Sequence, residues 1–430
     1  MSTRPAPDVI VVGGGPAGSA SATTLAMRGY RVLLIEQQRH PRYHIGESLI
    51  PFCYYTLERL GLAERMKASP CIQKFSVQFV GISGAETRPF YFFEHLYHPA
   101  AVAWQVLRSD FDRMLLDNAI AKGVEVIEDC QVEELVLDGN LVVTGVRVRA
   151  ADGTRRTLLA PMTIDASGRD ALAPKQFGWR VLDDELNRFA LWTYYTGAAR
   201  DPGIDAGATT VAAVPQGGWF WYIPLHHDII SVGVVHRREW LFRSANGSSE
   251  PDLDAIFKRA AAQNPWIARH LSGGKRSDRY RVTNEYSYRS SHCARDGLLL
   301  AGDALSFLDP IFSSGVYLAL RMGELAAEAV DAALKAGDVS ASRFSDYGAT
   351  VSAGVQAIRS LVYAYYAPDF SFAQLIKRDP GSRVHISDLL IGNFFRDYAP
   401  FFDLVKDVTV GLPKNLVSMP PWSRQGGARA

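Results

Sequence analysis

Short apolar runs separated by glycines open the chain. Residues 9–12 (VIVV) and 31–35 (RVLLI) are β-branched and apolar, which is typical of strands buried on both faces. Between them, residues 20–28 have the composition of a helix that ends at Gly29. This order predicts a strand–helix–strand unit within about 30 residues, and therefore the beginning of a parallel sheet.

The same two periodicities continue along the chain. Residues 124–148 alternate between apolar and polar positions with turn signals, which is typical of a meander. Residues 186–285 contain alternating runs rich in Trp and Tyr, which predict a mixed or antiparallel sheet. The other predicted elements are helices over 57–67, 110–122 and 315–334, strands over 74–80, 158–164 and 298–301, and a mostly helical remainder.

The first strand runs directly into the glycine loop Gly13-Gly14-Gly15-Pro16-Ala17-Gly18, which opens the helix. Its G-x-G-x-x-G spacing allows a tight turn and a close approach of backbone to a pyrophosphate, at a helix end that offers free N–H groups. An acidic residue, Glu36, ends the second strand, where it can bind ribose hydroxyls. We therefore expect a dinucleotide to be bound by Gly13, Gly15, Pro16, Ala17, Gly18, Glu36 and Gln37.

NAD and FAD are both bound by such loops, and later segments favour FAD. Residues 165–168 (DASG) and 302–304 (GDA) each end a buried strand and resemble two recurring motifs of FAD enzymes. The resemblance implies that Asp303 binds the ribityl chain or the pyrophosphate. It also implies that Arg108 reaches the pyrophosphate, although Arg108 is alternatively a surface residue at the start of a helix. The motifs add Asp165, Gly168 and Gly302 to the expected cofactor site.

Charge and cysteine content exclude several other classes. The 46 basic and 45 acidic residues leave a formal net charge of +1, so nothing favours nucleic acid or an anionic membrane as partner. The four cysteines form no CxxC pair, so we expect no metal site. No apolar stretch is long enough for a membrane span, and the first residues lack the apolar core of a signal peptide. We therefore expect a cytoplasmic protein.

Four segments resemble the flavin-dependent halogenases, within the p-hydroxybenzoate-hydroxylase-like flavoproteins. Residues 219–224 (WFWYIP) match the WxWxIP pattern, and residues 307–315 (FLDPIFSSG) match the FxDPxxSxG segment. Residues 44–51 (HIGESLIP) match the IGES/T segment, which places Ser48 at the cofactor. Lys74, with Phe79 five residues on, matches the surroundings of the family's catalytic lysine.

The resemblance implies a chemistry for these residues. In that family, reduced FAD and oxygen give a C4a-hydroperoxide, which oxidises chloride or bromide to hypohalous acid. Backbone N–H groups at Ser314 and Gly315 are then the expected halide site, or else an ordinary flavin-contacting helix start. Lys74 is expected to hold the hypohalous acid for the substrate, and burial would lower its pKa; the alternative is a solvated strand lysine.

Trp219 and Trp221 share one face of a strand, where they shield the flavin from substrate or pack in the core. The tryptophan-type halogenases carry a glutamate where this chain has Phe312, so Phe312 argues against free tryptophan. It resembles the phenol and pyrrole halogenases, many of which act on substrates tethered to a carrier protein. We therefore expect an electron-rich aromatic substrate, free or tethered to an acyl or peptidyl carrier protein.

The predicted fold is α/β: a Rossmann-type FAD-binding domain interleaved with a mixed β-sheet substrate domain and a helical C-terminal cap. The FAD-binding domain takes residues 1–185, with inserted strands at about 70–105, and returns over 286–335; the platform is 186–285 and the cap 336–430. Without a second nucleotide fingerprint, FADH2 is expected from a separate flavin reductase. The alternative functions are an FAD-dependent monooxygenase, a geranylgeranyl-reductase-like oxidoreductase or a non-catalytic flavin-binding partner.

Overall fold

The computed structural model describes residues 6–243, 251–284, 287–409 and 412. Its central sheet has six strands, of which only the β20 edge is antiparallel to its neighbour. The four residues of β1 are fully paired on both sides and buried, as its apolar run predicts. In spatial order the strands are β20 (Ala294–Arg295), β21 (Leu298–Leu300), β11 (Met162–Asp165), β1 (Val9–Val12), β2 (Val32–Ile35) and β7 (Glu125–Ile127).

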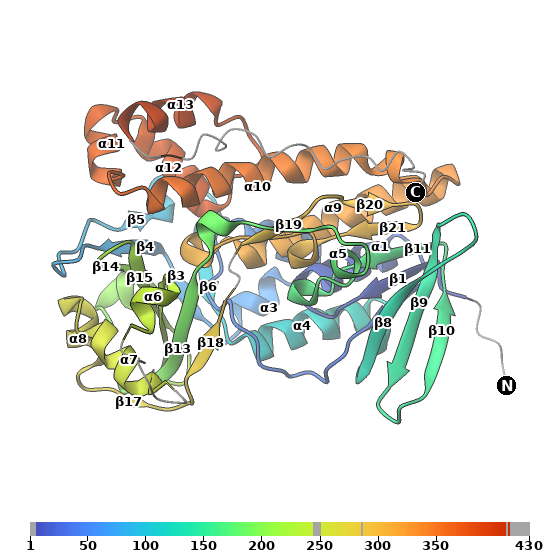
Figure 1. Ribbon diagram of the computed structural model, residues 1–430, viewed down its shortest axis with the longest axis horizontal. Coiled ribbons are helices and arrows are strands. Elements are labelled where there is room, and N and C mark those ends of the chain that lie inside the picture. Colours follow the sequence, from blue (N-terminus) through green and yellow to red (C-terminus); the bar gives the residue numbers. More distant parts are fainter. Residues whose placement is uncertain (1–5, 244–250, 285–286, 410–411, 413–430) are drawn as a thin grey trace.

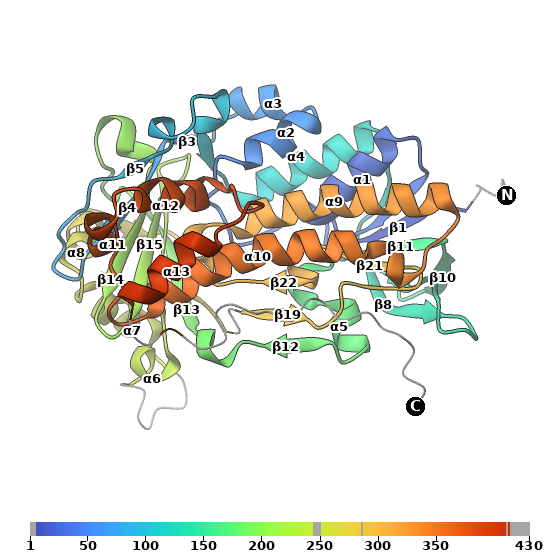
Figure 2. The same cartoon turned by 90° about the horizontal axis from the view of Figure 1, so that it is seen from above.

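Three helices lie side by side on this sheet: α4 (Arg108–Ala121), α1 (Pro16–Met27) and α9 (Gly315–Ala336) (Figure 2). Helix α1 is in the middle and consists mainly of Ala, Gly, Ser and Thr. Small side chains let α9 approach closely, since a Cβ at Gly323 would lie 2.4 Å from the Ala17 carbonyl oxygen. This packing places the beginning of α1 beside the third turn of α9.

A second, mixed sheet forms the predicted platform beside the nucleotide sheet (Figure 1). Strand β4 runs parallel to β14 and brings the inserted segment into this sheet, whereas the other pairs are antiparallel. One side of the sheet packs on the main core, and the other covers a separate apolar cluster with α7 (Leu253–Ala261) and α8 (Pro265–Leu271). The strands are β17 (Lys275–Arg276), β13 (Phe189–Thr196), β16 (Ile229–His236), β15 (Gly218–Pro224), β14 (Thr209–Val214), β4 (Ser76–Val80) and β5 (Phe90–Tyr91), with β18 (Arg281–Thr283) also on β13.

Two predicted elements are wrong in their extent. The helix over 57–67 is two helices, α2 (Cys53–Arg59) and α3 (Ala63–Lys67), because Gly61 takes a positive φ of 77° between them. The strand over 74–80 is also two strands: β3 (Ile72–Lys74) pairs with β6 (Ala103–Gln105), and β4 belongs to the platform. Lys74 is therefore the last residue before the chain changes sheet.

The smaller elements complete the two layers. The meander predicted over 124–148 is confirmed for β8 (Cys130–Leu137) and β9 (Val143–Ala150), which β10 (Arg155–Leu159) joins, but its first residues form β7 of the central parallel sheet. The predicted 158–164 run falls on β10 and β11. Helix α6 (Arg238–Leu241), like α7 and α8, lies in the region predicted to be strands alone. The remaining short elements are α5 (Leu172–Gln176), β12 (Arg180–Leu182), β19 (Tyr288–Ser290) and β22 (Ser306–Phe307).

The C-terminal region is helical, as expected. Helix α10 runs along α9, and α11 to α13 cover the end of the platform near β4 and β5 (Figures 1 and 2). These helices are α10 (Ser345–Tyr366), α11 (Phe372–Arg378), α12 (Ser382–Ile391) and α13 (Ala399–Val408). The last residues of the predicted cap, 413–430, lie outside the described residues, and the domain boundaries remain a prediction. No helix in the described ranges combines the length and apolar character needed to cross a bilayer.

Candidate active site

A cavity of about 1280 Å³ lies where the carboxyl ends of the nucleotide strands meet the platform. Its volume exceeds the roughly 300–1,000 Å³ of ordinary ligand pockets. Because its lining extends from the glycine loop to the platform, the cavity suits a dinucleotide. One end is formed by the glycine loop, Glu36 and Gln37. The other end is formed by the platform tryptophans and the beginning of α9.

The glycines of the loop serve two different purposes. At Gly13, with φ 101°, a Cβ would lie 2.4 Å from the Ala166 carbonyl oxygen, and at Gly18 it would lie 1.8 Å from the Gly13 carbonyl oxygen. Both are therefore required by the packing of the loop on β11 and α1. Gly15 has an ordinary φ of −75°, and its added Cβ would meet only the Arg42 guanidinium, 3.7 Å away. The protein does not need a glycine there, but a ligand lying on the loop does.

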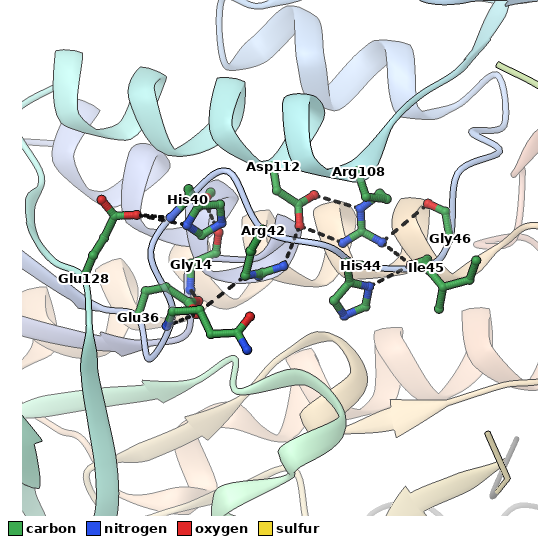
Figure 3. A network of polar contacts seen from close by, with 12 residues as sticks. Gly14, Glu36, His40, Arg42, His44, Ile45, Gly46, Arg108, Asp112 and Glu128 are labelled. Carbon is green, nitrogen blue, oxygen red and sulfur yellow. Dashed lines mark hydrogen bonds and ion pairs between the residues drawn. The ribbon is translucent and has the colours of Figure 1, made fainter. Parts of the chain in front are cut away.

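A charged network supports this end of the cavity (Figure 3). The Gly14 N–H donates to Glu36 Oε2 over 2.7 Å, and the Arg42 side chain bridges Glu36 and Asp112, at 3.6 and 3.3 Å. Asp112 also holds Arg108 through two bonds of 2.8 and 2.9 Å, the paired geometry that makes such contacts strong. The glycine loop, the segment after β2 and α4 are thus joined by ion pairs.

Arg108 is buried but remains charged. Burial opposes its charge, but the Asp112 carboxylate outweighs burial and raises the pKa of Arg108 above its ordinary value. Its Nη1 donates to the Ile45 carbonyl oxygen over 2.7 Å, which ties the side chain to the segment over 42–48 that lines the cavity. Arg108 is therefore not the exposed helix-start residue of the alternative interpretation.

The two aspartates of the FAD-like motifs differ in position. Asp303 lines the cavity, and burial raises its pKa to about 6, although Arg169 and Arg108 act in the opposite direction. Asp165 is fully buried and does not line the cavity; its carboxylate accepts the N–H groups of Ser167 and Ala173, over 3.0 and 2.8 Å. Asp165 shapes the turn whose residues face the cavity, and Asp303 is the carboxylate available to a ligand.

The beginning of α9 closes the opposite end. Ser313 adopts the left-handed conformation (φ 54°), Ser314 is the buried N-cap, and Gly315 lines the cavity. A Cβ on Gly315 would meet nothing within 4 Å, so this glycine also leaves space for a ligand. The first N–H groups of a helix have no intrahelical partner and carry its positive dipole end, which suits a small anion.

The two platform tryptophans line the same end of the cavity, with ring centroids 6.1 Å apart. Trp219 Nε1 donates to the Tyr366 hydroxyl over 2.7 Å, and Trp221 Nε1 donates to Ser231 Oγ over 3.1 Å. Tyr366 belongs to α10, so the C-terminal cap helps to hold this wall. Both rings are fixed in position and face the space that a flavin would occupy.

Lys74 lies just behind the cavity wall, with only 1% of its surface exposed. Its Nζ donates to Ser48 Oγ over 2.8 Å and to the Leu49 carbonyl oxygen over 3.1 Å. Burial lowers the pKa of Lys74 to about 7, and Cys53 opposes this only in part. Ser48 Oγ is also 2.7 Å from Thr209 Oγ1, and both residues line the cavity. The amine is thus separated from the cavity by one hydroxyl side chain.

Most of the residues predicted from sequence line this cavity, and the others lie behind its wall. Phe312 points away from it and packs against Tyr365 and Phe372 of the cap. Of the predicted residues, those that do not line the cavity are Gly18, Lys74, Asp165, Gly302, Phe312 and Ser314; Gly302 packs on Ala17 behind it. Sequence reasoning missed Arg42 and Glu47, both on the cavity wall, although Glu47 lies within the quoted segment 44–51.

Comparisons with known proteins agree with this arrangement. The family model described as tryptophan halogenase matches residues 93–370, and the one described as FAD dependent oxidoreductase matches residues 8–176. The chain belongs to the tryptophan halogenase family. Its FAD-binding fold and its class as a flavin-dependent enzyme are thereby confirmed, and FAD is its cofactor.

The individual relatives of this halogenase differ in length. This chain is 32% identical over 398 residues to 1H-pyrrole-2-carbonyl-[peptidyl-carrier protein] brominase of Pseudoalteromonas luteoviolacea (strain 2ta16), and the match covers 92% of this chain and 94% of the relative. It is 34% identical to the flavin-dependent halogenase armH3 of Armillaria mellea, covering 76% of this chain but only 68% of that longer protein. The solved structure of the flavin-dependent brominase Bmp2 superposes with a TM-score of 0.82 at 29% identity, covering 94% of this chain and 98% of that one.

Proposed function

We propose that the protein uses FADH2, oxygen and chloride or bromide to halogenate an electron-rich aromatic ring, with Lys74 delivering the oxidised halogen. The observation that carries this proposal is the position of Lys74: a buried amine with no carboxylate partner among the described residues, one hydroxyl away from the flavin cavity. Bound reduced FAD supplies the electrons that reduce oxygen. The residues of the chain then have to bind the halide and guide the oxidised halogen.

Each end of the cavity supports one part of this task. In this proposal Glu36 binds the ribose of FAD, Arg108 the pyrophosphate and Asp303 the ribityl chain or the pyrophosphate, and all three residues line the cavity. Gly315 and the unpaired N–H groups at the start of α9 provide the positive site for the halide. Trp219 and Trp221 separate a substrate on the Lys74 side from the flavin, so that the ring meets hypohalous acid rather than the flavin itself.

The Lys74 side favours an apolar, electron-rich substrate. Behind Lys74, the Phe92 ring lies 5.6 Å from Nζ, and Phe79 packs against Phe372 of the cap. Phe312 belongs to the same aromatic cluster, so position 312 supplies no carboxylate to assist a less reactive ring. We propose a pyrrole or phenol, and favour a pyrrole presented on a peptidyl carrier protein, because the brominase matched over 94% of its length has a carrier-bound pyrrole in its name.

The remaining partner in the proposal is the enzyme that supplies FADH2. The chain has one dinucleotide loop, so a separate flavin reductase is expected to provide the reduced cofactor. The cytoplasm, where such reductases and carrier proteins meet, is the proposed location.

The test combines the purified protein with a flavin reductase, NADH, FAD, oxygen and bromide or chloride. The substrates are a panel of phenols, free pyrrole-2-carboxylate and pyrrole-2-carboxylate loaded on a carrier protein. We expect halide-dependent product with the isotope doublet of chlorine or bromine, strongest for the carrier-bound pyrrole. Hydroxylated product, or turnover that is independent of halide, would instead support a monooxygenase.

A further inference from the structure

Glu47 is a buried carboxyl group on the cavity wall that the proposed function does not yet use. It is 2% exposed and lines the cavity between Gly46 and Ser48. Its Oε1 accepts the Tyr194 hydroxyl over 2.8 Å. Within the described residues its Oε2 is buried and makes no hydrogen bond of ordinary geometry, although the Ser231 hydroxyl lies close enough to favour the ionised form. A buried carboxyl oxygen without a partner is costly unless the group is protonated or meets a ligand.

A chain of hydroxyl groups leads from Glu47 to Tyr43, which also lines the cavity and is partly exposed. The Tyr194 hydroxyl lies 3.1 Å from the Tyr43 hydroxyl, and Tyr43 is 45% exposed. Trp192 Nε1 donates to the same Tyr43 oxygen over 2.8 Å and fixes its position. The Arg281 guanidinium covers the Tyr43 ring at 4.0 Å and pairs with Asp278, whose side chain is 40% exposed. The hydroxyl chain therefore connects a buried acid with groups in contact with water.

The groups around Glu47 keep its pKa close to neutral pH. Burial raises the pKa of Glu47 to about 7, whereas the Ser231 and Tyr194 hydroxyls and the charges of Arg108 and Arg281 favour its ionised form. Tyr43 and Tyr194 remain neutral, because burial raises the pKa of each above its ordinary value. Glu47 is thus the member of the chain that changes charge near neutral pH.

The reaction requires a proton at this place. Oxidation of a halide X⁻ by oxygen and reduced flavin is balanced as FADH2 + O2 + X⁻ + H⁺ → FAD + HOX + H2O. The flavin and the halide each lose two electrons, and oxygen gains four. The later substitution, ArH + HOX → ArX + H2O, releases no proton to replace the one consumed. One proton must therefore reach the flavin cavity in every turnover.

We propose that Glu47, Tyr194 and Tyr43 form a proton relay that delivers this proton from solvent to the flavin cavity. Resting on the proposed function, the relay assigns Glu47 as the donor at the cavity, Tyr194 as the connecting hydroxyl and Tyr43 as the entry point. After Glu47 gives up its proton, Tyr194 passes one to it over the existing hydrogen bond. Tyr43 then restores the Tyr194 proton and regains its own from water.

The first experiment needs no catalysis. Infrared titration of the FAD-free protein is expected to show the carbonyl stretch of a protonated carboxyl group that is missing in Glu47→Gln and disappears with a midpoint near pH 7. A Glu47-dependent band with a midpoint near that of free glutamate, or no such band at acid pH, would overturn the relay. Because halogenation is not measured, this result is independent of the proposed function.

The second experiment measures hypohalous acid formation with a colour-forming trap, as a function of pH. Glu47→Gln should lose the decline in rate above pH 7, and Tyr194→Phe should slow halide oxidation by about 100-fold while FAD binding is unchanged. Small weak acids such as acetic acid or imidazole should restore much of the rate in Tyr194→Phe, because they enter the cavity and donate the proton directly.

Tyr195→Phe is the matched control: Tyr195 is the next residue on β13 and packs in the apolar cluster on the opposite face of the sheet. It should retain the normal rate and pH profile. If Tyr194→Phe behaves like Tyr195→Phe, or if its rate is not restored by weak acids, Tyr194 does not carry protons. Wild-type protein that makes no hypohalous acid but titrates Glu47 near pH 7 would refute the function and leave the acid assignment standing.

Discussion

Arg108 and Lys74 are both buried cations at one cavity, yet they have opposite surroundings. Arg108 is held by both oxygens of Asp112 and keeps its charge. In the part of the chain that the structure describes, Lys74 is bonded only to a hydroxyl and a carbonyl oxygen, and its pKa falls to about 7. A buried charge is stable when it is paired and shifts towards neutrality when it is not. The cofactor end therefore has fixed charges for binding, and the substrate end has an amine that can exchange protons.

The strongest test of this difference is the removal of the amine. Lys74→Ala should lower halogenation by about 10²–10⁴-fold, because hypohalous acid is no longer held at the substrate. The substitution leaves Arg108 and its partners unchanged. The dissociation constant for FAD, measured by quenching of flavin fluorescence, should therefore remain within a factor of about two to three of the wild-type value. Halogenation that persists at the wild-type level in Lys74→Ala would remove Lys74 from the mechanism.

Removing the carboxylate from the paired end should damage the fold instead. Asp112→Asn leaves Arg108 buried without its counter-ion, which should reduce the free energy of unfolding by about 3–5 kcal/mol in urea titrations. The control is Asp117→Asn on the same helix, where the Arg113–Asp117 pair is partly exposed. That variant should lose less than about 1 kcal/mol. Equal losses in the two variants would contradict the distinction drawn between them.

The pH dependence of stability should separate the two cations. Between about pH 7 and 10.5 the unfolded chain carries a proton on Lys74 that the folded protein lacks, so this group makes the folded state more stable as pH rises. Relative to Lys74→Met, the free energy of unfolding of wild type should rise by about 1.4 kcal/mol per pH unit across this window. Below pH 7 the difference should be constant. A flat difference across the window would mean that Lys74 stays charged when buried.

The smallest expected effect concerns the space reserved for the cofactor. Gly15→Ala adds a methyl group that the protein itself accommodates, so its thermal stability should be nearly unchanged, while FAD affinity falls about tenfold, equivalent to about 1.4 kcal/mol. Gly18→Ala would place the methyl group against the Gly13 carbonyl oxygen and should destabilise the fold itself. Normal FAD affinity in Gly15→Ala would show that the cofactor does not lie on the loop at that residue.

The cofactor end was predictable because its signals are local in the sequence. Strand, glycine loop, helix and Glu36 follow one another within a single strand–helix–strand unit, and the structure confirms their order. The two predicted element boundaries that were wrong also have local causes. The positive φ of Gly61 divides one helix, and the change of sheet after Lys74 divides one strand, which periodicity within a single segment cannot show.

The sequence by itself determined the dinucleotide loop, the parallel sheet and the identity of the residues that could bind FAD, since each depends on neighbours along the chain. Only the tertiary structure decided which of these residues are paired. Asp112 reaches Arg42 from α4, Ser48 meets Lys74 across 26 positions, and Tyr194 reaches Glu47 from the platform across 147. Burial and pairing set the pKa of a side chain, and both arise from contacts between distant segments. The chemistry of Lys74 and Glu47 is therefore a property of the fold.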